Sequence, residues 1–555
     1  MLSKKLDHIV QLFEEIGILR WVISPGSRNA PIVAALLRNP SMQLFSMPDE
    51  RSAAFSAMGM AQSDQFPAAF LCTSGSALVN AFPAVVEAYY QRIPLCIVSA
   101  DRPEELIDQW DGQTLRQPGI FGTYVRHSHH CNPRNSSEHE LTEGIYQLFQ
   151  DSFTQIPSPF HLNIALSEPI YEGISDINSA SEASSTTDSL SSSTASSAVK
   201  PFVYKASQIP KITLEDISSA IGSAQKIALL VGQNPPSETL SQVLSELQNY
   251  LPIFSDVCSS QQPYGLKSWD WALLKREIPE SLKPDLLISL GTVTLSKPLK
   301  NFLRKHKPRH IHLGLHSEIG DPFETNPVHI PCFEADFLQG ILELWNTHNA
   351  EDQLNYCKKH SEDWQQFLAA QPLKSNELPE PFSSELAWMQ QFFKSIDERF
   401  IIHLGNSMPV RYGSWSLPTA AQIFSNRGVS GIDGCLSTAV GSALAQPEKI
   451  VIAVLGDVTT VYDSNALWTD LPSNLRVVVF NNSGGRIFDW IEGPNKFPEL
   501  RKFIHTPRKF DFKHLSKFYG VEHQSLGVEQ VEASIQKLFF AETATLIELI
   551  CKDDN

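Results

Sequence analysis

The amino-acid sequence predicts an α/β protein made of three domains in series, each a mainly parallel sheet flanked by helices. Two observations predict this class. Short aliphatic runs alternate with segments of helical periodicity, which is typical of parallel strands joined by crossover helices. The chain has 555 residues, too many for one hydrophobic core, and its 42% hydrophobic and 19% charged content is ordinary for a globular protein.

The first predicted domain covers residues 1–175. It opens with an amphipathic helix whose apolar positions are Leu6, Ile9, Val10, Phe13 and Ile16. Predicted strands follow at "RWVIS" (20–24), "AAFLCTS" (68–74) and "PLCIVSA" (94–100). Helical patterns lie between them at "PIVAALLRN" (31–39), which starts at a proline, and at residues 77–90. This alternation predicts a parallel sheet with helices on both faces.

Residues 176–200 are predicted to be a flexible linker, because "SASEASSTTDSLSSSTASSA" (179–198) cannot build a core. The middle domain, 201–365, has strand patterns at "KIALLVG" (226–232), "DLLISLG" (285–291) and "RHIHLGL" (309–315). A helix-rich join around 350–370 leads to the C-terminal domain, 366–555. Its clearest strands are "KIVIAVLGD" (449–457) and "LRVVVFNN" (475–482).

Charge and cysteine content restrict the class of partners. A net charge of −17 argues against nonspecific nucleic-acid binding and against an anionic membrane surface. The 8 cysteines include no CxxC pair, which favours reduced thiols over a disulfide scaffold or zinc site. The N-terminal segment lacks the apolar core of a signal peptide, and no apolar run approaches the ~20 residues of a membrane helix. We therefore expect a cytoplasmic protein.

Two strand ends in the C-terminal domain carry candidate metal ligands. Asp457 ends the strand of "VLGDVTTVYDSNALW", and Asn482 follows the strand of "LRVVVFNNSGGRIF". Ligands bind at the carboxyl ends of parallel strands, and oxygen ligands with phosphate oxygens suit Mg²⁺. A helix beginning after Asp457 could support a diphosphate at its N-terminus. Taken singly, Asp457 could be only a helix cap, and "NNSGG" could be only a turn.

A second charged stretch stands at the start of a small-residue segment. In "DERSAAFSAMGMA" (49–61), Asp49, Glu50 and Arg51 precede a run that is suited to burial. Glu50 lies at a predicted strand–helix junction and is a candidate buried acid. The alternative is that these charges only complement the helix N-terminus.

Several stretches occur in the order of one known enzyme family. They include "ISPGSRNAPI" (23–32), "SADRPEELID" (99–108), "SNRGVSGIDG" (425–434) and "GDVTTVYDSNAL" (456–467). The Asp457–Asn482 pair resembles the metal-diphosphate motif of thiamine-diphosphate enzymes, although Val458 stands where a second glycine is usual. As a whole the chain closely resembles the MenD family, the 2-succinyl-5-enolpyruvyl-6-hydroxy-3-cyclohexene-1-carboxylate synthases of menaquinone biosynthesis. The resemblance is dense in both outer domains and weak in the middle domain.

The resemblance implies a thiamine-diphosphate-binding fold and a transferase reaction. The family decarboxylates 2-oxoglutarate and adds the succinyl unit to isochorismate in a 1,4 sense. By resemblance, Glu50 is the acid that activates the cofactor ring, and Ile432 is the apolar wedge that bends the cofactor. Asp457, Asn482 and the Gly484 carbonyl match the ligands of Mg²⁺ or Mn²⁺. The resemblance also implies a homodimer or homotetramer whose active sites lie between subunits.

Both substrates are dicarboxylates, which planar guanidinium groups bind in a two-pronged manner. The substrate-binding residues implied by the resemblance are Ser27, Arg28, Arg102, Gln113, Lys297, Ser407, Arg411, Arg427, Ile487 and Phe488. In some relatives a second basic residue follows the middle-domain lysine, whereas here Pro298 follows it. Either one substrate contact is missing, or a residue such as Lys300 or Arg304 replaces it.

Two alternatives to this function remain. The chain could be another thiamine-diphosphate carboligase or decarboxylase, such as an acetolactate-synthase-like enzyme, although the middle domain lacks a Gly-x-Gly-x-x-Gly fingerprint for FAD. It could also be a non-catalytic relative, although Glu50 and the metal ligands are all present. "HSHHC" (127–131) suggests a metal cluster, but no second cluster follows, and we expect a surface loop there.

Overall fold

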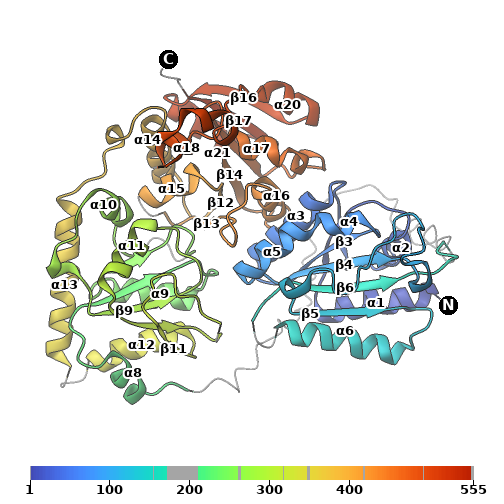
Figure 1. The fold of residues 1–555 in the computed structure, drawn as a ribbon, viewed down its shortest axis with the longest axis horizontal. Coiled ribbons are helices and arrows are strands. Elements are labelled where there is room, and N and C mark those ends of the chain that lie inside the picture. Colours follow the sequence, from blue (N-terminus) through green and yellow to red (C-terminus); the bar gives the residue numbers. More distant parts are fainter. Residues whose placement is uncertain are drawn as a thin grey trace. The chain divides into compact units, whose positions relative to one another are not determined.

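The computed structural model describes residues 2–153, 156–171, 211–260, 264–316, 318–346, 350–416, 419–491 and 493–551. The strands among these residues form three sheets, each flanked by helices (Figure 1). All strand pairs within them are parallel. The predicted α/β class is confirmed. The predicted linker, 176–200, lies outside the described residues.

The first sheet has six strands in the order β2-β1-β3-β4-β6-β5. Its strands are β1 (Arg20–Ile23), β2 (Gln43–Ser46), β3 (Ala68–Cys72), β4 (Leu95–Asp101), β5 (His127–Cys131) and β6 (Phe160–Ala165). The accompanying helices are α1 (Leu2–Ile16), α2 (Ala30–Arg38), α3 (Glu50–Asp64), α4 (Ser76–Asn80), α5 (Phe82–Gln91) and α6 (Glu138–Phe153). β3, β4 and β6 are buried along their whole length, as expected for strands covered on both faces.

The C-terminal sheet repeats this topology, with the order β13-β12-β14-β15-β17-β16. Its strands are β12 (Phe400–Leu404), β13 (Gln422–Phe424), β14 (Ile450–Gly456), β15 (Leu475–Asn481), β16 (Glu522–Gly527) and β17 (Thr545–Ile550). The main helices around it are α14 (Phe382–Ser395), α15 (Met408–Trp415), α17 (Asp457–Tyr462), α20 (Phe512–Tyr519) and α21 (Val531–Phe540). In both sheets the strand order reverses beside the first strand, where open α/β sheets bind ligands.

The middle sheet has the order β11-β10-β9-β7-β8. It consists of β7 (Ile227–Val231), β8 (Ile253–Ser255), β9 (Leu286–Leu290), β10 (Arg309–Leu313) and β11 (Val328–Ile330). Its helices are α8 (Leu214–Ile221), α9 (Glu238–Leu247), α10 (Trp269–Lys275), α11 (Lys297–His306), α12 (Glu334–Trp345) and α13 (Glu351–Ala369). The last of these forms the helical join expected around 350–370.

Two local expectations were wrong. The helix expected over 77–90 is divided into α4 and α5, because Pro83 has no N–H and occupies the first turn of α5. Residues 127–131 form β5 rather than a surface loop, since an edge strand tolerates polar side chains and its backbone pairs with β6.

Within the described ranges, no group of three or more His, Cys, Asp and Glu side chains could hold a metal ion.

The chain divides into two compact units. The first comprises residues 1–206, 428–447 and 463–472, and the second comprises the rest. The first unit therefore includes two segments from the C-terminal third, which contain α16 (Cys435–Ala445) and η7 (Ser464–Leu467). In that unit α3 and α16 touch backbone to backbone. A Cβ atom on Gly59 would lie 2.0 Å from the Thr438 carbonyl oxygen, and one on Gly441 would lie 1.9 Å from that of Ser56.

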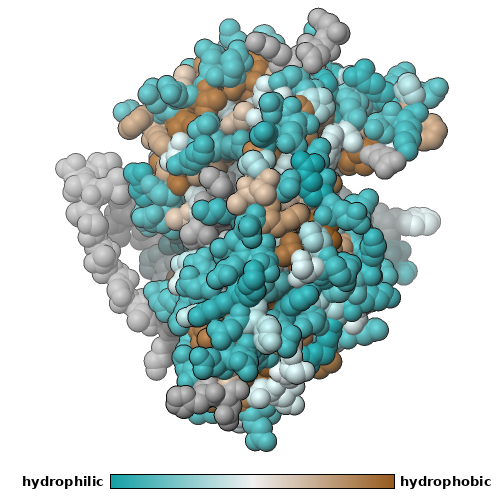
Figure 2. Space-filling model, turned by 90° about the vertical axis from the view of Figure 1, so that its left-hand side faces the viewer, coloured by the Kyte–Doolittle hydropathy of each residue, from teal (hydrophilic) through white to brown (hydrophobic). Residues whose placement is uncertain are grey.

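No helix in the described part of the chain is long and apolar enough to cross a membrane. The face drawn in Figure 2 carries mostly hydrophilic residues, with smaller groups of hydrophobic ones among them.

Candidate active site

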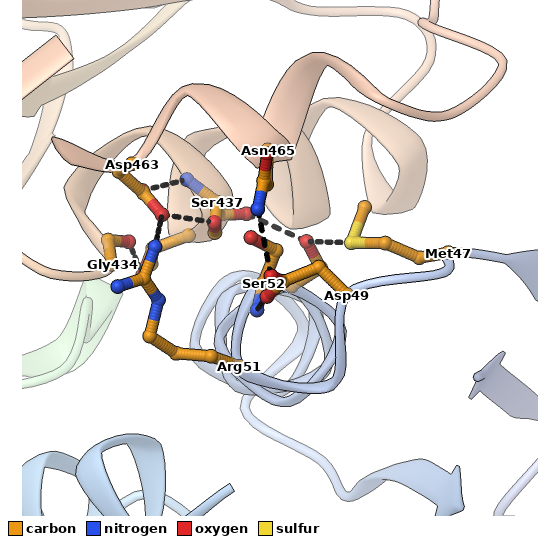
Figure 3. A network of polar contacts seen from close by, with 10 residues as sticks. Met47, Asp49, Arg51, Ser52, Gly434, Ser437, Asp463 and Asn465 are labelled. Atoms are coloured by element: carbon orange, nitrogen blue, oxygen red, sulfur yellow. Dashed lines mark hydrogen bonds and ion pairs between the residues drawn. The ribbon is translucent and has the colours of Figure 1, made fainter. Parts of the chain in front are cut away.

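The three charges that begin α3 have three different surroundings. Asp49 is the N-cap of α3, and its side chain accepts a hydrogen bond from the Ser52 N–H at 2.8 Å. Arg51 points to the buried carboxylate of Asp463, 3.8 Å away (Figure 3). Glu50 is half-buried, rather than fully buried as expected, and accepts a hydrogen bond from the Asn80 amide at 3.3 Å. The flanking charges thus have structural partners, whereas the Glu50 carboxylate has one long hydrogen bond among the residues that the structure describes.

The carboxyl ends of β14 and β15 bring the predicted metal ligands to one corner of the second unit. Asp457 accepts hydrogen bonds from the N–H groups of Gly484 (2.9 Å) and Val458 (2.7 Å). Asp457 is 1% exposed, and this burial raises the pKa of its carboxyl to about 6. A cation beside the carboxylate would offset the burial and favour the ionised form.

Asn482 has a free oxygen at the same corner. The Asn482 side-chain nitrogen donates to Glu385 Oε1 at 2.8 Å. This hydrogen bond fixes the orientation of the amide, so that the Asn482 Oδ1 atom points away from Glu385. That Oδ1 atom is buried and has no hydrogen-bond partner within the described part of the chain. A buried acceptor without a donor is costly, so an oxygen held in this way suits a cation. The Gly484 carbonyl accepts the Arg486 N–H at 2.8 Å and keeps one lone pair for a ligand.

The first unit also holds a pair of arginines near the ends of β1 and β4. Arg28 is 4% exposed, donates to the Leu166 carbonyl at 2.8 Å and pairs with Glu168 at 3.1 Å. Arg102 lies 3.7 Å from Asp111. Burial and then the charge of Arg102 lower the pKa of Arg28. The Nε atoms of both arginines are buried and have no acceptor among the described residues, so an anionic ligand would meet unused donors.

A second cationic cluster lies in the second unit and comprises Arg411, Arg427 and Lys300. Arg411 donates to the Ser407 carbonyl at 2.5 Å, and Arg427 donates to Asn406 Oδ1 at 2.8 Å. Burial and then the charge of Arg427 lower the pKa values of both Arg411 and Lys300. Arg427 Nε is also buried, and no described residue accepts a hydrogen bond from it. Arg427 therefore adds positive charge beside both Arg411 and Lys300, and such a concentration of positive charge favours a bound anion.

Of the two residues considered as replacements for a second middle-domain cation, Lys300 lies next to Arg427, whereas Arg304 adds a smaller positive charge to Lys300 and has an acidic partner of its own. Arg304 pairs with Glu324 at 3.3 Å and donates to the Pro322 carbonyl at 2.9 Å. Lys297 is exposed at the first position of α11. Asp256 is buried beside the cluster and contributes a negative charge to both Arg427 and Lys300.

The remaining predicted residues differ in exposure. Ser27 and Gln113 are exposed, and Ser407, Ile432 and Phe488 are half-buried. Ile487 begins α18 (Ile487–Trp490) and is buried. Gln113 and Ser407 have positive φ angles of 58° and 80°, which are uncommon for residues other than glycine and often occur at functional turns.

Comparison with known proteins identifies the family. Residues 4–120 match the N-terminal TPP binding domain of thiamine pyrophosphate enzymes, and residues 388–549 match their C-terminal TPP binding domain. A Cytophaga hutchinsonii protein named 2-succinyl-5-enolpyruvyl-6-hydroxy-3-cyclohexene-1-carboxylate synthase is 34% identical, over 93% of this chain and 90% of its own length. Proteins of the same name from Bacteroides thetaiotaomicron and Desulfotalea psychrophila are each 32% identical, over 97% and 96% of this chain and 93% and 95% of their own lengths.

The chain belongs to this synthase family.

The metal corner of this synthase-family protein fits a metal-bound diphosphate. Asp457 and Asn482 offer one anionic and one neutral oxygen, and the Asn482 oxygen accepts no hydrogen bond from the residues that the structure covers. α17 begins at Asp457, so its first N–H groups lie beside these oxygens. Oxygen ligands of mixed charge, next to a helix N-terminus, are the donor set that Mg²⁺ and a diphosphate need together.

Three residues that shape these sites were missed in the sequence. Asp463 binds Arg51, and Asn406 binds Arg427. Glu385 orients Asn482 with one oxygen and accepts the Tyr412 hydroxyl at 2.7 Å with the other. Of these three, Glu385 could have been recognised from the sequence. It is an acidic residue at helical spacing from the apolar residues Trp388, Met389 and Phe392, and a buried acid requires polar partners.

Proposed function

We propose that the protein decarboxylates 2-oxoglutarate and transfers the succinyl unit to isochorismate. The product is 2-succinyl-5-enolpyruvyl-6-hydroxy-3-cyclohexene-1-carboxylate, formed with release of CO₂ in menaquinone biosynthesis. The observation that carries the proposal is the near-full-length similarity to proteins with that enzyme name. The cationic clusters support it, because both substrates are dicarboxylates.

The cofactors of this proposal are thiamine diphosphate and a divalent cation, Mg²⁺ or Mn²⁺. When bound, thiamine diphosphate supplies the nucleophilic carbon and the electron sink that decarboxylation of a 2-oxo acid requires. Asp457, the Asn482 oxygen and the Gly484 carbonyl would hold the cation. Glu50 would hold a proton at its carboxyl and share it with the cofactor's pyrimidine ring, and Ile432 would press against the cofactor as an apolar wedge.

The remaining side chains would bind and orient the substrates. Arg28 and Arg102 have unused Nε–H donors in one unit, and Arg427 has one in the other, so each cluster can hold a carboxylate. Ser27, Gln113 and Ser407 would add neutral hydrogen bonds, and Lys297 would add a charge. Ile487 and Phe488 would form an apolar wall that keeps water from the reacting carbon.

The test is an assay with 2-oxoglutarate, isochorismate, Mg²⁺ and thiamine diphosphate that follows the loss of isochorismate absorbance. We expect turnover that requires all four additions. Glu50→Gln should bind the cofactor with little change and lose most turnover, because the amide cannot exchange a proton with the ring. Turnover of pyruvate but not 2-oxoglutarate would instead support the carboligase alternative, and absence of Mg²⁺-dependent cofactor binding would support the non-catalytic one.

We further propose a homodimer, or a tetramer built from such dimers, in which each site uses Glu50 from one subunit and the metal corner of its partner. Co-expression of Glu50→Gln and Asp457→Asn chains tests this directly. Each variant should be inactive alone, and random pairing should restore about a quarter of wild-type activity, since half of the dimers contain one intact site out of two. Sites formed within one subunit would give no recovery. We expect the enzyme to work in the cytoplasm.

A further inference from the structure

The residues on either side of Glu50 are tied to one distant segment of the chain. This segment, residues 463–469, runs beside residues 46–51 in the first unit (Figure 3). The Asn465 amide donates to Asp49 Oδ2 at 2.8 Å, and Asp463 faces Arg51 at 3.8 Å. At the C-terminal end of the segment, the Thr469 hydroxyl donates to the Ser46 carbonyl at 2.7 Å. The contacts therefore flank Glu50 without including it.

The anchor of this arrangement is the Asp463 carboxylate. Its side chain is 0% exposed and accepts both the N–H and the hydroxyl of Ser437, each at 2.7 Å. Ser437 is a buried residue of α16, which packs backbone to backbone on α3. Burial raises the pKa of Asp463 to about 7, and the Ser437 donors and the Arg51 charge act in the opposite direction. A carboxylate in so dry a position is costly unless its hydrogen bonds are kept.

The first turn of α3 is the part that these contacts hold. Helix ends fray, because the first N–H groups have no partners within the helix. Asp49 satisfies one of them, the Ser52 N–H at 2.8 Å, and Asn465 in turn holds the Asp49 side chain. Arg51 fixes the other neighbour of Glu50 to Asp463. With both neighbours held, the Cα–Cβ direction of Glu50 has little freedom to change.

We propose that segment 463–469 is a positioning element for Glu50, in which Asp463 acts through Arg51 and Asn465 acts through Asp49 to direct the Glu50 carboxyl at its target. The inference rests on the proposed function, in which that target is the pyrimidine ring of thiamine diphosphate. It adds to that function by assigning the segment a role in cofactor activation, separate from binding of cofactor or substrate. Misplacement of a reacting group by ~1 Å can lower a rate by about 100-fold.

The experiment compares Asp463→Asn with the wild-type holoenzyme. This substitution keeps the side-chain volume, removes the charge that faces Arg51 and replaces one of the two oxygens that accept from Ser437 with an NH2 group. We expect kcat to fall about 10- to 100-fold, with KM for both substrates and Kd for thiamine diphosphate changed less than about threefold. The decisive readout is exchange of the cofactor's C2 proton for deuterium, followed by NMR without substrate. It should slow by the same factor as kcat.

Two sets of variants separate positioning from general structural damage. Arg51→Met should reproduce the effect, and the Arg51→Met/Asp463→Asn double variant should lose no more than Asp463→Asn alone, because that single variant already breaks the Arg51–Asp463 pair. Arg51→Lys keeps the charge and should recover part of the exchange rate. Asp7→Asn is the matched control. It removes the 2.6 Å pair with Arg38 elsewhere in the same unit and should leave the exchange rate unchanged.

The outcomes distinguish this inference from the function on which it rests. A wild-type protein that does not accelerate C2 exchange would overturn the proposed function. If the wild-type protein accelerates exchange and Asp463→Asn matches it, the function stands and the positioning role fails. Fully additive losses for Asp463→Asn and Arg51→Met would also overturn the role, because they would show that Asp463 does not act through Arg51.

Discussion

The crossing of α3 and α16 leads to the sharpest stability prediction. At this crossing Gly441 faces the Ser56 backbone, and an added Cβ atom would lie 1.9 Å from its carbonyl oxygen. An ordinary separation of these atoms is about 3.3 Å, so Gly441→Ala forces the two helices apart by more than 1 Å. Neither atom belongs to a flexible side chain, which means that the backbones themselves must move.

The change in the free energy of unfolding caused by Gly441→Ala has two parts. Dispersion between the two helices becomes weaker, and helix propensity at position 441 becomes higher. An interface of about 40 atom pairs at ~0.15 kcal/mol each contributes about 6 kcal/mol, and a gap of ~1 Å forfeits up to half of that. Replacing a helical glycine by alanine returns about 1 kcal/mol through backbone entropy. The net loss is therefore about 2 kcal/mol, within the range for overpacked cores. For a unit of this size, that lowers Tm by roughly 4 to 8 °C.

The assay is thermal unfolding of Gly441→Ala beside Gly340→Ala. The control is also a buried helical glycine, in α12, but its added Cβ would meet the end of the Ile217 side chain at 2.2 Å, which can rotate away. We expect Gly340→Ala to change Tm by less than about 3 °C in either direction. If Gly441→Ala is as stable as this control, the helices do not touch backbone to backbone and the reasoning is refuted.

Three further predictions concern pH, substrate and metal. Burial lowers the pKa of His161 from 6.5 to about 3, so the folded chain resists a proton that the unfolded chain accepts, and stability is lost as pH falls below 6.5. At pH 5 the free energy of unfolding should be about 2 kcal/mol lower on account of this histidine. Denaturant titrations of wild type and His161→Gln at pH 7.5 and pH 5 measure this difference, which the substitution should abolish. If the two proteins lose the same stability between these pH values, His161 is not its source. Arg427→Met should raise KM for one dicarboxylate about 10- to 100-fold at near-constant cofactor affinity, and unaltered kinetics for both would remove Arg427 from the site. Chelation of divalent cations should abolish thiamine diphosphate binding in calorimetry and added Mg²⁺ should restore it, whereas binding in EDTA would contradict a metal-held diphosphate.

The sequence predicted the elements well where burial is uniform. β3, β7, β9 and β15 appear where runs rich in apolar residues predicted them, because such runs are stable only when covered on both faces. It failed at residues 127–131, where an edge strand is polar and carries no such pattern. It also did not foresee that segments 428–447 and 463–472 pack with the first unit.

The candidate site divides in the same way. Asp457 and Asn482 were predictable because each directly follows a strand rich in aliphatic residues, and strands that pair in parallel have their carboxyl ends at one edge of the sheet. Lys300 could not be separated from Arg304 by spacing alone, since both lie on α11. Only the packing of that helix places one beside Arg427 and the other beside Glu324.

By itself, then, the sequence determined the parallel sheets, the chemistry-bearing side chains and the family that their motifs resemble. The tertiary structure alone decided which polar groups meet: Glu385 with Asn482, 97 residues apart, and Asn465 with Asp49, 416 residues apart. The physical reason is the separation along the chain over which each kind of interaction acts. Hydrophobic periodicity is read over a few turns of chain, whereas a buried polar group must find its partner wherever the fold excludes water from both.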